Sequence, residues 1–107
     1  MPKSDATVVK ELVTRMAQAA LSRSIGRAES VTTQAVDLTD RTAMHSIDFT
    51  CVRMDREFKG RATVQYNSER GQWMPGNVFL EGCAYMCAYN PGQRRDRPVV
   101  FDLVTSI

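Results

Sequence analysis

The chain changes its hydrophobic period once, near Gly26, and this change constrains the fold more than any other feature. Before Gly26, apolar residues recur at spacings of three and four; after it, β-branched and aromatic residues alternate with polar ones as far as the C-terminus. The first spacing is that of one face of an α-helix, and the second is that of a half-buried β-strand. The sequence therefore predicts one helix followed by a sheet, which is the order of an α+β domain.

The predicted helix covers about residues 5 to 25 and has a single apolar stripe. Ser4 or Asp5 can cap the free amides of the first turn, and Gly26 suits the left-handed position that ends many helices. The polar side mixes both charge signs, which is typical of a helix packed on a protein core and not of one lying on a membrane. The stripe consists of Val9, Leu12, Val13, Met16, Ala19 and Ala20.

Segments with a period of two follow the helix. The clearest is residues 58–66, in which aromatic, aliphatic and glycine residues alternate with charged or polar ones. Residues 67–71 are typical of a hairpin loop, and Pro75–Gly76 predicts a bend in the chain. The other predicted strand segments are residues 31–38, 47–54, 72–74 and 99–104.

Residues 77–90 fit either a strand or a helix. Their β-branched and aromatic residues favour a strand, while their leucine, alanine and methionine residues would also suit a helix capped by Asn77. We predict a strand, because the loop of residues 91–98 is bounded by prolines and leads into another short apolar strand, which together make a long hairpin. With a helix here the fold would still be α+β.

The predicted architecture is a single α+β domain over residues 1–107. Its N-terminal amphipathic helix packs on a curved antiparallel meander of four to five strands, and 107 residues are enough to bury one core. The same element order occurs in cystatin-like and related half-barrel domains, in which the sheet wraps round the helix. Such folds serve inhibitors, chaperones, small-molecule binders and enzymes, so the architecture does not select one of these functions.

Charge and hydropathy argue against two classes of partner. Fourteen basic and twelve acidic residues leave a net charge of +2, which is too small to predict binding to a phosphate backbone. No apolar run approaches the roughly 18 residues that span a bilayer, and the N-terminus lacks the apolar core of a signal peptide. We therefore expect a cytoplasmic protein that uses neither a nucleic acid nor a membrane as its partner.

The three cysteines, Cys51, Cys83 and Cys87, argue against a disulfide framework and a zinc ribbon. Their number is odd, and no two of them form a Cys-x-x-Cys pair. In a strand, Cys83 and Cys87 would share a face at about 13 Å, which is too far for a bond. In a helix they would lie one turn apart, and a metal or redox pair would become possible. The strand prediction leads us to expect reduced thiols, no metal and no cofactor.

His45 is the only histidine and the obvious candidate for acid–base catalysis. Asp40, Asp48 and Asp55 lie near it in the sequence. However, His45 and Asp48 are three residues apart and so point to opposite sides of a strand, and no nucleophile is tied to them by spacing. The sequence therefore contains no catalytic constellation, although the role of His45 stays open.

Two sets of residues suggest binding surfaces. The first is the arginine loop, Arg94, Arg95 and Arg97, which a hairpin tip could present to an acidic protein surface or to phosphates. The second is an aromatic set whose members after Asn77 would share one strand face if the stretch is a single strand. This aromatic set consists of Trp73, Phe79, Tyr85 and Tyr89.

Two hypotheses about function follow. We expect a small non-enzymatic protein-interaction module, such as a self-associating homodimer, an inhibitor or an adaptor of the kind that phages and mobile elements encode. It would act through its sheet face or its arginine loop. The alternative is a small-molecule binding protein or small enzyme with a pocket between helix and sheet. A polar cavity would favour the alternative, and a filled core with an apolar outer patch would favour the interaction module.

Overall fold

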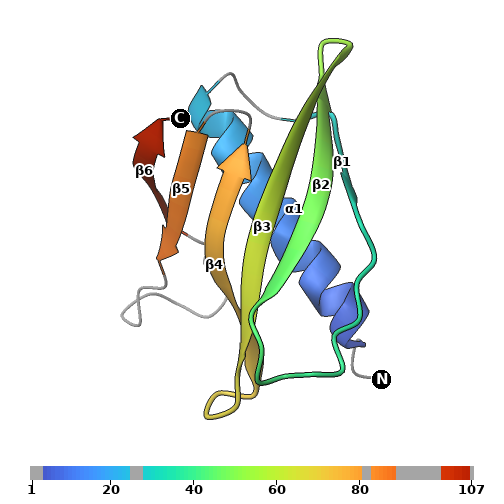
Figure 1. Cartoon of the computed structure of the whole chain (residues 1–107). Helices are drawn as coiled ribbons and strands as arrows, with labels where there is room; N and C mark the ends of the chain where they lie inside the picture. The colour runs from blue at the N-terminus through green and yellow to red at the C-terminus, as the bar shows by residue number, and fades with distance from the viewer. Residues whose placement is uncertain (1–3, 25–27, 81–82, 89–99, 107) are drawn as a thin grey trace.

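A computed structural model describes residues 4–24, 28–80, 83–88 and 100–106, with side chains for residues 4–21 and 28–80. One helix precedes a sheet, which confirms the predicted α+β class (Figure 1). The predicted helix at about 5 to 25 is observed as α1. The elements are α1 (Asp5–Ser24), β1 (Ser30–Thr33), β2 (His45–Arg53), β3 (Arg56–Asn67), β4 (Gln72–Leu80), β5 (Cys83–Ala88) and β6 (Val100–Ser106).

The strands form an antiparallel meander in the order β1-β2-β3-β4-β5-β6. The meander confirms the prediction, but six strands exceed the expected four to five. The stretch 77–90 is strand wherever it is described, and it is shared between two strands: Asn77 to Leu80 belong to β4, and Cys83 to Ala88 form β5. The preference for strand over helix is therefore confirmed, whereas the single strand is replaced by an antiparallel pair.

The bend expected at Pro75–Gly76 is a β-bulge within β4. Between the pairs Ala62↔Val78 and Val64↔Pro75, β3 has one residue and β4 has two, so the register shifts there. The Asn77 N–H donates to Thr63 Oγ1 at 2.7 Å across the bulge. A strand can absorb an extra residue in this way without ending, and Gly76 allows it because a Cβ atom would collide with the Thr63 side chain.

Helix α1 covers one face of the sheet, over β1 to β4 (Figure 1). The predicted stripe is buried there except for Ala19, which is only partly buried against the core. The buried apolar residues of the helix are Val9, Leu12, Val13, Met16, Ala17, Ala20 and Leu21. Their counterparts elsewhere are Ala28, Leu38, Ile47, Phe49, Cys51, Phe58, Ala62, Val64, Trp73, Val78 and Leu80.

Strand β1 is shorter than the predicted segment 31–38. The Gln34 N–H still donates to the Asp48 carbonyl oxygen at 2.8 Å, but the chain then leaves the sheet. Leu38 is buried and Val36 is half-buried against the core. These apolar residues therefore pack between helix and sheet instead of continuing the alternation, because burial of their side chains outweighs further strand pairing.

Candidate interaction surfaces

The outer face of β2 to β4, on the side opposite α1, is polar with one exposed aromatic ring. Asp48, Arg61 and Phe79 lie side by side across the three strands. The Arg61 Nε donates to Asp48 Oδ1 at 2.8 Å, and this bond raises the pKa of Arg61. Phe79 is 37% exposed beside this pair. The outer face thus has mostly polar residues around one exposed aromatic ring, and many interfaces between proteins have such a mixed composition.

The predicted aromatic set does not form one surface. Trp73 is only 6% exposed and packs in the core, while Phe79 lies on the outer face. Tyr85 lies opposite Val78 in the register, and Phe79 lies opposite Ala84. Because opposed residues share a face, the positions of Phe79 and Tyr85 fall on different faces, which corrects the single face expected from one continuous strand. Tyr89 and the arginines Arg94, Arg95 and Arg97 lie outside the described residues.

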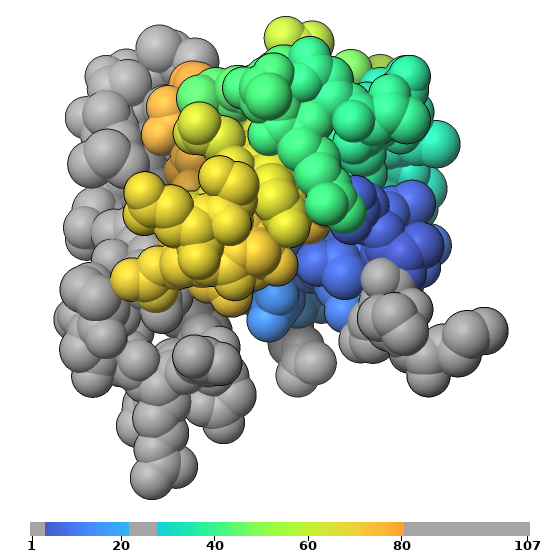
Figure 2. Space-filling model, turned by 90° about the horizontal axis from the view of Figure 1, so that it is seen from below, coloured from blue at the N-terminus to red at the C-terminus, as the bar shows by residue number. Residues whose placement is uncertain are grey.

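Trp73 belongs to a cluster of rings at the end of the sheet where α1 begins. Its indole lies 5.3 Å from the Tyr66 ring and 5.8 Å from the His45 ring. The Arg41 guanidinium stacks over Tyr66 at 4.4 Å and binds Asp5 at 2.8 Å. Seen from below, the start of α1 (blue), the segment before β2 (green) and the β3–β4 hairpin (yellow) meet at this surface (Figure 2).

The Asp5 carboxylate is held mainly by arginine. Its hydrogen bonds from Arg41 are the largest cause that lowers the pKa of Asp5, partly offset by desolvation. The Trp73 indole lowers it further, although its Nε1–H makes no hydrogen bond of ordinary geometry within the described part of the chain. The ion pair joins the first turn of α1 to the segment that precedes β2 and so links the helix to the sheet. The Asp5 carboxylate also places a negative charge at the helix N-terminus, where the helix dipole favours it.

His45 does not assemble a catalytic site with the groups described. Its Nε2 lies 2.6 Å from the Asp40 carbonyl oxygen, which accepts the Nε2 proton. Asp48 is on the other face of β2, bound to Arg61, as the three-residue spacing predicted. Cys51 is buried, and desolvation raises the pKa of its thiol to about 11, which keeps it protonated and unreactive at neutral pH. Among the residues with described side chains, no group of three His, Cys, Asp or Glu is placed to hold a metal ion.

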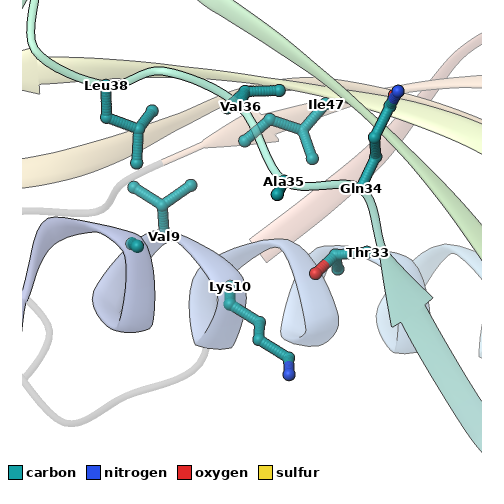
Figure 3. Close-up of a pocket in the computed structure, with 9 residues that line it drawn as sticks. Val9, Lys10, Thr33, Gln34, Ala35, Val36, Leu38 and Ile47 are labelled. Carbon is teal, nitrogen blue, oxygen red and sulfur yellow. The ribbon is translucent and has the colours of Figure 1, made fainter.

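A shallow apolar hollow lies between the first half of α1 and the segment that follows β1 (Figure 3). Its volume is about 210 Å³, below the roughly 300 Å³ at which small-molecule pockets begin. Val9 and Leu38 approach each other across it, and the polar ends of Lys10 and Gln34 point away from it. The hollow therefore has few polar groups to orient a ligand. Its lining is Ala6, Val9, Lys10, Thr33, Gln34, Ala35, Val36, Leu38 and Ile47.

The free edge of β1 borders this hollow. Because Gln34 bonds to β2, the alternation of an antiparallel ladder turns the backbone groups of Thr32 towards β2 and those of Val31 and Thr33 outward. No described strand pairs with this outer side of β1. This edge was not predicted from the sequence, although the uncharged and proline-free run Ser30–Thr33 was a signal for it.

Comparison with known proteins adds no identification: no family model, curated protein or solved structure matches the chain. Within the described residues, no helix has the length and apolar character needed to cross a membrane.

Proposed function

We propose that this chain is a small non-enzymatic protein-interaction module that associates with itself through the exposed surface of its sheet. The observation that carries the proposal is the one-sided cover of the sheet: α1 lies on one face of β1 to β4, and the opposite face presents Phe79 beside the Asp48–Arg61 pair. A polar surface with an exposed aromatic contact is suited to a protein partner. We expect the module to work in the cytoplasm.

The interior supports this proposal over a ligand carrier. The core between α1 and the sheet is filled by apolar side chains, and no polar or charged residue is buried among those whose side chains are described. A small-molecule site usually has a few convergent polar groups inside an apolar cavity. The hollow beside α1 is small and open, and the polar ends of Lys10 and Gln34 point away from it. Two other hollows, of about 460 Å³ each, lie on the outer face of β1 to β3 and beside the β3–β4 hairpin, and they are more open to solvent. We therefore make no second proposal for a small-molecule function.

The exposed outer face is less apolar than expected. An interaction module was expected to have an apolar outer patch, but the described outer face is mostly polar, with Phe79 as its exposed ring. Interfaces that form and dissociate resemble the rest of a protein surface in composition. We therefore propose reversible self-association, with a dissociation constant in the micromolar range or weaker, and not an obligate dimer.

Light scattering across about a hundredfold dilution series tests the proposal, because mass action makes a reversible dimer dissociate on dilution. We expect a mass near twice 12.0 kDa at the highest concentration, falling towards 12.0 kDa on dilution. A mass of one chain at every concentration would contradict self-association.

A further inference from the structure

We infer that the outer edge of β1 is where a second copy of this chain docks, by antiparallel pairing of the two β1 strands into one continuous sheet. This inference rests on the proposed self-association and assigns it to the edge of the sheet at β1 instead of to the outer face around Phe79. Strand addition at an exposed edge obtains its affinity from backbone hydrogen bonds and its selectivity from the neighbouring side chains.

The edge of β1 is short, which limits pairing, but it lacks the charged and proline residues that prevent edge pairing. Natural sheets protect their edges with charged residues, prolines or bulges, and Ser30–Thr33 has neither a charge nor a proline. The opposite edge strand of the sheet, β6 (Val100–Ser106), includes a charged residue, Asp102. The first half of β4 is a further exposed edge. Only Asn77 to Leu80 of β4 pair with β5, and Pro75 lies in the part of β4 that pairs with β3 alone. A proline there removes a donor that a further strand would need.

The backbone of β1 is complementary to itself. A two-fold axis at Thr32 places Val31 opposite Thr33 of the second copy, and Thr33 opposite its Val31. Val31 and Thr33 are the residues whose N–H and C=O groups point outward, so each of these pairs exchanges two hydrogen bonds. Thr32 then meets Thr32 of the second copy at a narrow pair on the outer face, an arrangement that favours threonine.

The charges near the edge do not oppose this register. Glu29 falls opposite Ala35 of the second copy, and Ser30 falls opposite its Gln34, so no like charges face each other. On the helix side, Val31 of the second copy comes to lie beside Thr33, at the rim of the apolar hollow. The Val31 side chain of the second copy would thus lie beside the hollow. An apolar side chain suits this lining, which has few polar groups to bind a small ligand.

The short edge also sets the strength of the pairing. Four strand residues with a small apolar contact provide less than the roughly 1,000 Å² that stable specific interfaces bury. The dimer should therefore be weak and concentration-dependent, as a reversible module requires.

The test is light scattering of Thr33→Pro against Thr33→Val at the concentration at which the wild-type chain is dimeric. Proline removes the outward N–H of Thr33 without breaking a bond to β2, and valine keeps that N–H with a similar shape. We expect Thr33→Val to remain a dimer and Thr33→Pro to weaken dimerisation by at least about tenfold. Circular dichroism establishes that both variants are folded.

Other outcomes separate the two proposals. A Thr33→Pro chain that is folded and still fully dimeric would overturn the edge inference. If Phe79→Ser abolishes the dimer while Thr33→Pro does not, self-association stands and the outer face is its surface. A wild-type monomer throughout would overturn both proposals. If Thr33→Pro does not fold, amide exchange of the wild-type chain at two concentrations decides: Val31 and Thr33 must gain protection in the dimer.

Discussion

The two faces of β2 to β4 alternate along the same strands but have different compositions. On the helix side, Ala62 and Val64 of β3 are fully buried; on the outer side, Arg61 and Gln65 are exposed. Among the residues whose side chains are described, the helix side buries no polar or charged residue, whereas the outer side carries an ion pair and a single exposed ring. The difference indicates that stability resides in one face, and that the other face and the free edge can change for binding at little cost to the fold.

The largest difference between the two faces is expected when the same charge is placed on each of them in turn. Val64→Asp would bury an unpaired carboxylate, at a cost of at least about 4 kcal/mol, which is a large share of the roughly 5–15 kcal/mol that stabilise a small domain. Gln65→Asp, on the next residue, should leave the chain folded because it faces solvent. Urea unfolding followed by circular dichroism measures both. Equal destabilisation would show that the faces are assigned wrongly.

Gly60 tests how tightly the buried face is packed. A Cβ atom there would collide with the Phe49 ring and with the Phe79 carbonyl oxygen, and the backbone atom cannot move aside easily. We expect Gly60→Ala to reduce the free energy of unfolding by about 1 to 3 kcal/mol. Val31→Ala is the comparison variant, because Val31 is only partly buried and this change removes side-chain atoms instead of adding one. An unchanged unfolding midpoint for Gly60→Ala would mean that the ring does not lie over this glycine.

Much of this division into faces was predictable from local patterns. Burial could be predicted from the residues of a single segment in two places: the helical stripe around Val13 and Met16, and the alternation in residues 58–66. Both predictions are confirmed. Their period follows from backbone geometry alone, so a single sequence is sufficient to recognise it.

The features that depend on pairing were not predictable. The bulge at Gly76 depends on Thr63 in another strand, and the relative faces of Phe79 and Tyr85 depend on where the chain turns between β4 and β5. The free edge of β1 is defined by which strand lies beside it and which does not. Such relations join distant parts of the chain, and neither propensity nor period contains them.

The Asp5–Arg41 pair joins α1 to the segment before β2, and its removal is expected to lower stability less than the changes on the buried face. Arg41 lowers the pKa of Asp5 in the folded chain, so the pair stabilises the fold above the unfolded-state pKa of Asp5, near its ordinary value of 3.8. This stabilisation is lost as the pH falls through the lower folded-state pKa. Asp5→Asn should therefore be less stable than wild type at neutral pH, by less than Gly60→Ala, and the difference should shrink in acid. Thermal unfolding at several pH values measures this. A gap that widens in acid would contradict the assignment.

The smallest effect is expected on the outer face. Arg61→Ala removes the ion pair with Asp48, but both side chains are exposed, so the unfolding midpoint should not change measurably. Light scattering of Arg61→Ala also distinguishes the outer face from the β1 edge as the dimer surface. If the dimer forms through the β1 edge, the variant should have the same mass as the wild-type chain. A marked loss of stability would show that the outer face contributes to the fold more than its exposure indicates.

Self-association through the β1 edge is tested most directly by amide hydrogen exchange of the wild-type chain, resolved by residue, at a dilute and a high protein concentration. We expect the amides of Val31 and Thr33 to exchange more slowly at the high concentration, while Thr32, already bonded to β2, changes less. Exchange at Val31 and Thr33 that does not depend on concentration would contradict self-association through the β1 edge.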